Sequence, residues 1–340
     1  MGALHSFNVR NGKVDYLCKF IDCASYRAVR DEGKIGYSEF ATDPCKSLFK
    51  KVQSYIFPSL PNMTDNPKIH VARIGDRYMA LGETPLQVEF DPLTLERTGV
   101  AELLPGAMAY KTTAHPHFEA EHAYNLVVKF GMQSFYRFYD MADPGRRLAS
   151  VPVAKPAYLH GFGMSKKYFI IAAGPLVVVP IHLLFWKRPY IENHRWLPEE
   201  GASIWVIEKE SGKLKARFET DPFFCFHHIN AWEEGEELIM DLDAYDDASI
   251  ISHYYLKELE KPGVRLPKGT LRRFRLNLRN KKSQAETLSD ACIELPRIDY
   301  NRFNTDGRYG FTYGVSLHPE QPNGFYNLSL IHISEPTRRR

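Results

Sequence analysis

The feature that most limits the fold of this chain is a strand–turn–strand pattern that runs along nearly its whole length. Leu4–Val9 and Lys13–Phe20 flank Asn11-Gly12, a dipeptide that favours a tight hairpin turn because both residues accept positive φ. Helical periodicity is confined to Cys45–Ile56 and Ile251–Leu259. Many short strands joined by Gly, Pro, Asn and Asp predict an all-β fold: a sandwich, a barrel or a propeller. Further strands are expected at Tyr78–Leu81, Leu86–Phe90, Tyr124–Phe130, Ser134–Tyr139, Ile204–Lys209, Lys213–Glu219, Glu237–Ala244 and Thr270–Leu278.

Composition and charge exclude several classes of protein. A net charge of +3 over 340 residues, with no basic stripe around the aromatic residues, argues against nucleic-acid binding. The five cysteines are scattered and form no CxxC pair, which is typical of free thiols in a reducing compartment. The first residues lack the basic and apolar regions of a signal peptide, so we expect a cytoplasmic protein.

One apolar segment, Tyr168–Trp186, is long enough on paper to cross a bilayer. A glycine and two prolines interrupt it, however, and its residue types favour a strand. We therefore predict a buried strand over Tyr168–Ala173 and an apolar loop over Leu176–Trp186. Basic residues flank the segment, so two interpretations of the loop stay open: contact with a membrane surface, or packing against the protein core.

Three histidine strings carry the functional signal: TAHPH around His115, LHGFG around His160 and FHHIN around His227. These histidines are 45 and 67 residues apart, and one propeller blade takes about 40–50 residues. A propeller places the innermost strand of each blade on a central channel, so one histidine per blade would point toward the same axis. Neutral imidazoles from separate strands can bind a transition metal. The spacing therefore favours a propeller, whereas spacing alone favours an ordinary core or surface role for each histidine over a metal ligand.

Longer motifs around these histidines resemble the carotenoid cleavage oxygenase family. The matching stretches are TTAHPHFE, LHGFGMSKKYFI, FFCFHHINAWEEGEELIMD and ELPRIDYNRFNTDGRYGFTYGV, with weaker matches in FATDPCKSLFKK and YMALGETPLQVEFDPLTLE. The resemblance covers the chain from Leu4 to about Tyr326. It implies a seven-bladed β-propeller with non-haem Fe(II) on its axis, here incomplete because the family's last blades are not matched.

The resemblance also implies which residues surround the iron. Three of the family's four histidine ligands match His115, His160 and His227, and the fourth, near the family's C-terminus, has no match in this chain. Two glutamates that accept a hydrogen bond from the outward N–H of a ligand histidine match Glu83 and Glu294.

The neighbouring histidines are not expected to bind the metal. His228 follows His227 directly and would face away in a strand, because successive side chains alternate. His117 matches no ligand of the family. We expect residues 1–327 to form the partial propeller, whereas residues 328–340 (LSLIHISEPTRRR) resemble a translated sequencing adapter and are expected to be a non-native tail.

The implied reaction is cleavage of one C=C bond of a carotenoid or apocarotenoid by O2, giving two carbonyl products, with iron as the cofactor and an apolar tunnel for the polyene. Activity is expected of a longer parent chain that carries the fourth histidine, and these 340 residues are expected to be inactive. Three alternatives stay open. They are cleavage of stilbene-type phenolics, a propeller that binds ligands without chemistry, and a calcium-dependent propeller hydrolase, which would need carboxylates and Asn at the axis.

Two further groups of residues lie near the histidine strings in sequence. Aromatic residues there would either line a tunnel or pack in the core, and acidic residues after the third string are expected to form a solvated loop and not a calcium site. Cys225 is expected to be a small buried residue. The aromatic residues are Tyr158, Phe162, Phe224, Phe226 and Trp232, and the acidic ones are Glu233, Glu234, Asp241, Asp243, Asp246 and Asp247.

Overall fold

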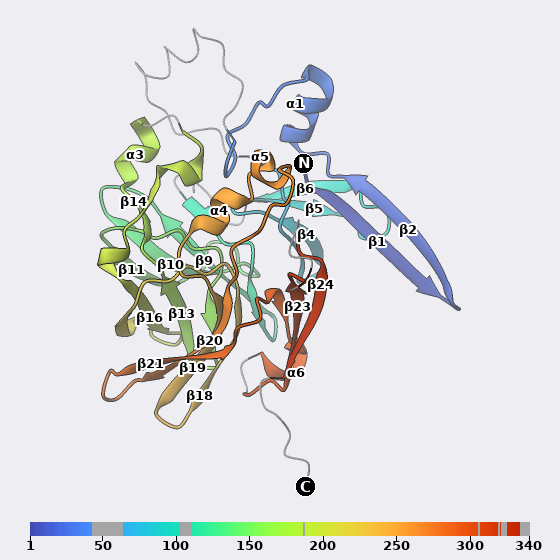
Figure 1. The fold of residues 1–340 in the computed structure, drawn as a ribbon. Coiled ribbons are helices and arrows are strands. Elements are labelled where there is room, and N and C mark those ends of the chain that lie inside the picture. The colour runs from blue at the N-terminus through green and yellow to red at the C-terminus, as the bar shows by residue number, and fades with distance from the viewer. Residues whose placement is uncertain are drawn as a thin grey trace. The chain divides into compact units, whose positions relative to one another are not determined.

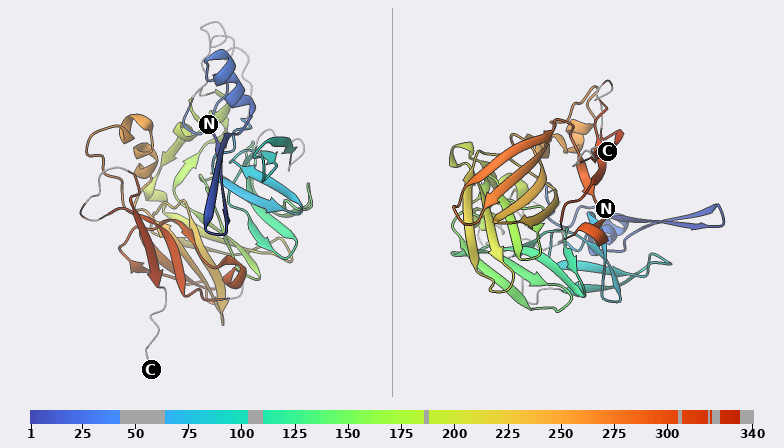
Figure 2. Two further views of the ribbon diagram at one scale, coloured as in Figure 1. Left: turned by 90° about the vertical axis from the view of Figure 1, so that its right-hand side faces the viewer. Right: turned by 90° about the horizontal axis from the view of Figure 1, so that it is seen from below.

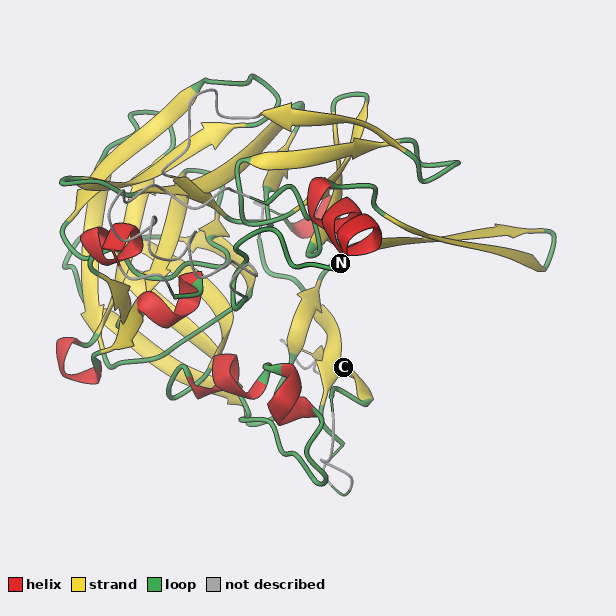
Figure 3. Cartoon of the chain, turned by 90° about the horizontal axis from the view of Figure 1, so that it is seen from above, coloured by secondary structure: helices red, strands yellow, loops and turns green. Residues whose placement is uncertain are grey.

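Most of the described chain forms β-strands that pair into antiparallel sheets, and short helices lie in the connections (Figures 1 and 3). The predicted all-β class is therefore confirmed. The predicted helix at Cys45–Ile56 lies outside the described residues. The computed structural model describes residues 1–42, 64–102, 110–185, 188–304, 307–318, 320 and 325–333.

The chain divides into two compact units, the first made of Met1–Pro156 with Val178–His194 and the second of Ala157–Val177 with Arg195–Arg340. The first unit contains the sheets β3-β4-β5-β6 and β11-β10-β9-β7, in which β8 also pairs with β9. Its strands are β1 (Ala3–Arg10), β2 (Lys13–Phe20), β3 (His70–Ile74), β4 (Arg77–Leu81), β5 (Leu86–Phe90), β6 (Arg97–Glu102), β7 (Tyr110–Thr112), β8 (His117–Glu119), β9 (His122–Lys129), β10 (Ser134–Asp140) and β11 (Arg147–Val153).

The predicted N-terminal hairpin is present as β1 and β2. Asn11 (φ 51°) and Gly12 (φ 73°) form its turn, as the dipeptide predicts. Figures 1 and 2 show that the hairpin extends as a two-stranded arm away from β4 and β5 of its own unit. Most of its side chains are exposed.

Helix α1 (Ala24–Glu32) follows the hairpin and was not predicted. Its N-cap is Cys23, whose sulfur accepts from the Tyr26 N–H, in place of the Ser, Thr, Asp or Asn that usually marks a helix start. Gly33 ends the helix in the left-handed conformation (φ 62°), and this glycine is the one strong sequence signal for the end of a helix here.

The second unit contains the sheets β12-β13-β16-β17, β18-β19-β20-β21 and β22-β23-β24. Every residue of β13 is buried, which confirms the predicted buried strand. The strands are β12 (Gly163–Met164), β13 (Tyr168–Ala173), β16 (Ala202–Glu208), β17 (Leu214–Thr220), β18 (His228–Glu234), β19 (Glu237–Ala244), β20 (Thr270–Asn277), β21 (Ser283–Ser289), β22 (Glu294–Arg297), β23 (Phe311–Ser316) and β24 (Leu328–Ile333).

The core of the second unit lies between facing strands of its sheets. Ile170, Ile204 and Met240 are fully buried in one cluster with Phe223 and Phe274, which pack at 5.2 Å between ring centres. The helix predicted over Ile251–Leu259 is present as two short helices, α4 (Ser249–His253) and α5 (Leu256–Leu259), and α6 (Tyr300–Phe303) follows β22.

The prediction of a solvated acidic loop is wrong for Asp241 and Asp243. Asp241 and Asp243 lie in β19, between two other strands, and their side chains are fully buried. Asp241 faces Arg273 across the ladder of β19 and β20, and its carboxylate binds the guanidinium through two contacts of 2.8 Å. A paired carboxylate can be buried in this way, so the spacing of acidic residues alone could not distinguish a loop from a strand.

The expected apolar loop over Leu176–Trp186 is also wrong in detail. Leu176–Val178 form strand β14, which pairs with β15 (His194–Trp196), and helix α3 covers Pro180–Phe185. A proline is well tolerated at the first position of a helix, because its missing N–H is not needed there. The 3-10 turns η1 (Tyr190–Asn193) and η2 (Pro198–Glu200) follow. Among the described residues, no helix has the length and apolar content needed to cross a membrane.

Residues of the expected tail take part in the last sheet. Leu328–Ile333 form β24, which pairs with β23 along its whole length, from Ser316 opposite Leu328 to Phe311 opposite Ile333. The bounds of the partial propeller at residues 1–327 and the non-native origin of residues 328–340 stay a prediction.

Candidate metal centre

The three predicted ligands all lie just outside regular strands. His115 is in the loop between β7 and β8, His160 is in the loop before β12, and His227 is the residue before β18. Loop ends of this kind free a side chain from the strict alternation of a strand, so that its ring can turn toward a neighbour. The ring of His115 also lies beside that of His70, with 5.8 Å between their centres.

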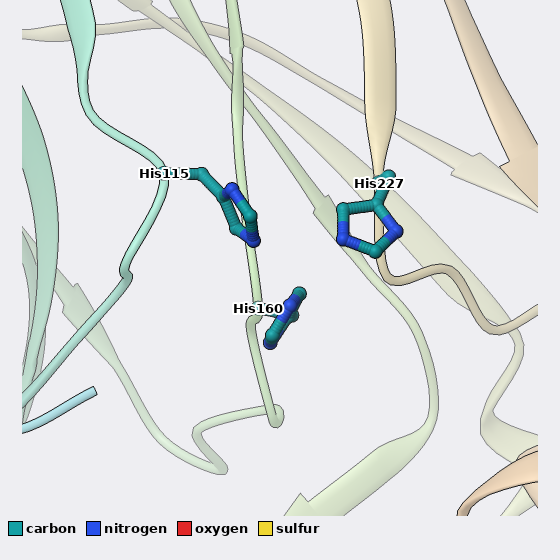
Figure 4. Close-up of side chains that lie close together, drawn as sticks. All are labelled: His115, His160 and His227. Atoms are coloured by element: carbon teal, nitrogen blue, oxygen red, sulfur yellow. The ribbon is translucent and has the colours of Figure 1, made fainter. Parts of the chain in front are cut away.

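The structure brings these three histidines together. Each offers one ring nitrogen, and these nitrogens all lie within 4.8 Å of one another (Figure 4). The rings of His160 and His227 meet edge to face, 5.1 Å apart. Two nitrogens that bind one ion at about 2.1 Å are at most about 4.2 Å apart, so small movements of the side chains would let the rings share an ion.

His227 is oriented by Glu294. The Nδ1–H of the ring donates to Oε2 of the carboxylate at 2.5 Å, and only 2% of the Glu294 side chain is exposed. Burial lowers the pKa of His227, which keeps the ring neutral at pH 7. Because Nδ1 carries the proton, the lone pair is on Nε2, the form of imidazole that binds a metal.

Two tyrosines support this arrangement: the sequence predicts an aromatic role for Tyr158 but not its contact with a histidine, and it does not single out Tyr245. The hydroxyl of Tyr158 lies 3.1 Å from Nδ1 of His160, and the hydroxyl of Tyr245 donates to Oε1 of Glu294 at 2.5 Å. Tyr158 is only two residues before His160, so its closeness to this histidine could have been noticed in the sequence. Tyr245 follows β19 and is remote from both histidines in sequence, so no local signal could have found it.

Glu83, the other predicted glutamate, is buried in the turn between β4 and β5. Its carboxylate pairs with Nζ of Lys111 at 3.1 Å, and the side chains are 5% and 13% exposed. The ammonium group also lies 4.5 Å from the ring centre of Tyr190. The role of Glu83 toward a ligand histidine stays a prediction.

The aromatic residues near the histidine strings separate into two groups. Tyr158, Phe224 and Phe226 form a continuous set, with 6.2 Å and then 4.7 Å between ring centres, and Phe226 meets His160 at 5.3 Å. Phe162 instead packs against Phe169, and Trp232 against Tyr309 in the core. The first group therefore borders the histidines and the second does not.

The neighbours of His227 in sequence point elsewhere. His228 lies against the backbone of Gly161 and Gly163, where a Cβ would come within 3.6 Å of its ring. Cys225 is a free thiol whose pKa is raised by burial, which leaves it protonated. The donor set is thus a group of three imidazoles without a thiolate, which suits a divalent transition metal.

Antiparallel sheets of blade size and a cluster of three histidines define an all-β protein with a candidate site for a transition metal. The family model described as retinal pigment epithelial membrane protein matches residues 1–339. The chain therefore belongs to this family of carotenoid cleavage oxygenases.

Curated relatives cover nearly all of the chain. The β,β-carotene 15,15'-dioxygenase of Rattus norvegicus is 28% identical over 381 residues, which cover 94% of this chain and 67% of that protein. The mitochondrial carotenoid-cleaving dioxygenase of Homo sapiens is 28% identical over 389 residues, covering 93% of this chain and 66% of that protein. The chain thus spans about two thirds of these relatives.

Solved structures show the same fold. Cobalt-substituted Synechocystis apocarotenoid oxygenase matches with a TM-score of 0.77 at 20% identity, covering 98% of this chain and 70% of that one. A variant of the same oxygenase matches with a TM-score of 0.79 and the same coverage. Together with the sheets described above, these matches confirm the predicted fold class, an incomplete seven-bladed β-propeller.

Proposed function

We propose that this protein acts as a non-haem iron dioxygenase that cleaves a C=C bond of a carotenoid or apocarotenoid with O2. The observation that carries the proposal is the cluster of His115, His160 and His227, whose nitrogens lie within 4.8 Å of one another. Ferrous iron held there would supply a site for O2 with no ligand carboxylate to reduce its charge. Two carbonyl products would result.

The residues of the chain contribute position and a dry environment. Glu294 and Tyr158 contact the Nδ1 atoms of His227 and His160, which leaves the Nε2 atoms available to the metal. The faces of Phe226 and Phe224 offer an apolar border on which a flat conjugated chain can lie. The polyene would be oriented by these contacts and shielded from water.

Cleavage of stilbene-type phenolics is the second candidate, and one observation favours it. The hydroxyls of Tyr254 and Tyr326 lie 2.6 Å apart, and the ring of Tyr254 stacks on Phe226 at 5.9 Å between centres. A pair of phenol groups beside the apolar border could bind the hydroxyl of a phenolic substrate, which a hydrocarbon polyene lacks.

The test begins with the metal. The metal-free chain is titrated with Fe2+ under anaerobic conditions, and we expect one ion per chain, lost in His227→Ala and retained in the neighbouring control His228→Asn. A chain that binds no iron would refute the proposal. The tandem histidines make a matched pair because both are at least partly buried and adjacent in sequence.

The iron-loaded chain is then given O2 with β-carotene, an apocarotenal or a hydroxylated stilbene. Carbonyl products that carry label from 18O2 would support the oxygenase, and the substrate consumed would choose between the two candidates. An iron-loaded chain that consumes no substrate would agree with the expected inactivity of these 340 residues and would leave the iron titration as the test of the proposal. The metal titration carries most weight, because its result does not depend on which substrate is supplied.

We further propose that the protein is cytoplasmic and contacts a membrane surface through the segment Leu176–Trp186. Val179 and Ile181 support this, since they are large apolar residues 45% and 50% exposed. Flotation with lipid vesicles should be lost in the double variant Val179→Ser, Ile181→Ser. Unchanged flotation of that variant, or none by the unaltered chain, would remove the proposal.

A further inference from the structure

The carboxylate of Glu294 is held at both of its oxygens. Oε2 accepts from Nδ1 of His227 at 2.5 Å and from the N–H of Leu295 at 3.2 Å, and Oε1 accepts from the hydroxyl of Tyr245 at 2.5 Å. The plane of the carboxylate is therefore fixed by donors on opposite sides, whereas one donor alone would let it rotate about its last torsion.

Tyr245 is itself held rigidly. It is 1% exposed, and its backbone forms a two-way bridge with Phe224, with hydrogen bonds of 2.7 and 2.9 Å. Its hydroxyl also lies 3.3 Å from that of Tyr326. Phe224 is three residues before His227, so the bridge links the end of β19 to the segment that carries the histidine.

A second acidic side chain lies beside this clamp. Asp243 is fully buried and within electrostatic reach of both Glu294 and Tyr245. Its backbone N–H donates to the carbonyl of His227 at 3.2 Å, so this acidic group is close to the Glu294 site. The hydroxyl of Tyr245 thus holds Glu294 at a place where a second acidic group is buried close by.

We propose that Tyr245 is a positioning residue for the metal centre: it fixes Glu294, and Glu294 in turn aims Nε2 of His227 at the ion. The proposal rests on the proposed function, since it needs the histidines to bind metal. In this proposal Tyr245 acts on the metal through its hydrogen bond to Glu294.

The experiment measures the affinity of the metal-free chain for Co2+, by calorimetry and by the visible absorption of the bound ion. Loss of a residue that supports a ligand weakens metal binding by about 10–100-fold, and we expect a loss in this range for Glu294→Gln and about tenfold for Tyr245→Phe. The matched control is Tyr254→Phe, which removes a hydroxyl from the same cluster that bonds Tyr326 and not Glu294. The control should bind within about twofold of the unaltered chain.

A double-mutant cycle tests the route of the effect. If Tyr245 acts through Glu294, adding Tyr245→Phe to Glu294→Gln should change the affinity by less than about twofold. Additive losses, or an equal loss in the Tyr254→Phe control, would overturn the proposal. If the unaltered chain binds no Co2+, the proposed function fails instead, which separates the two ideas.

A measurement on the unaltered chain covers the case in which Tyr245→Phe does not fold. The buried hydroxyl proton of Tyr245 should exchange slowly with water and give a separate downfield NMR signal, which disappears in Glu294→Gln. Absence of such a signal from the folded, unaltered chain would contradict the contact on which the proposal depends.

Discussion

Removing the charge of Asp241 should destabilise the second unit strongly. Asp241 is fully buried in β19 and accepts from Nε and Nη2 of Arg273, each at 2.8 Å, and from the hydroxyl of Tyr309 at 2.7 Å. Arg273 is 4% exposed and lies over the ring of Trp232 at 5.1 Å. The carboxylate therefore connects two neighbouring strands with the loop that precedes β23.

The substitution Asp241→Asn keeps the size of the side chain but turns one oxygen into an NH2 group that faces the guanidinium. The positive charge of Arg273 is then buried without its partner, and breaking a buried pair in this way costs about 3–5 kcal/mol. We expect a loss of that size in the free energy of unfolding, measured by urea denaturation and followed by tryptophan fluorescence.

The matched control is Glu219→Gln. Glu219 pairs with Arg217 at 2.9 Å, but the two side chains are 65% and 48% exposed, so the change should cost less than about 1 kcal/mol. If Asp241→Asn costs no more than this control, the reasoning from burial and bidentate geometry is refuted.

Three further changes test other parts of the structure. Burial lowers the pKa of His194 to about 4, so between pH 4 and about pH 6.5 the unfolded chain binds a proton at this residue and the folded chain does not. The free energy of unfolding should therefore fall by roughly 3 kcal/mol as the pH drops through this window. Denaturation at several pH values should show this fall in the unaltered chain and a smaller one in His194→Gln. Gly269→Ala places a Cβ 2.4 Å from Oδ2 of Asp243 and should lower the free energy of unfolding by about 1–3 kcal/mol. The control Gly310→Ala should change it very little, because the space around Gly310 is open. Equal melting temperatures of the two variants would contradict this. Lys111→Met removes the ammonium group that offsets the buried charge of Glu83, so the free energy of unfolding should fall by about 3 kcal/mol. An unchanged free energy of unfolding in urea denaturation would contradict this.

Local signals allowed much of the fold to be predicted. The Asn11-Gly12 turn, the buried run Tyr168–Ala173 and the strand Glu237–Ala244 are set by short-range sequence pattern, and the structure contains each of them. Helix α1 was missed because Cys23 replaces the usual cap. The burial of Asp241 could not be foreseen, since its partner Arg273 is 32 residues away and only pairing of the two strands brings them together.

The candidate site shows the same limit. His115, His160 and His227 were recognisable because each stands in a distinctive string, and the structure places their nitrogens close together. Glu294 was found through a motif, whereas Tyr245 was not, because hydroxyls that support a ligand follow from tertiary contacts and leave no pattern in the sequence.

The most direct test of the account is the position of a bound metal in crystals of the chain soaked with Co2+, located by anomalous diffraction. We expect one strong peak at about 2.1 Å from Nε2 of His160 and His227 and from a ring nitrogen of His115. A peak elsewhere, or none at these histidines under conditions that saturate the protein, would contradict it.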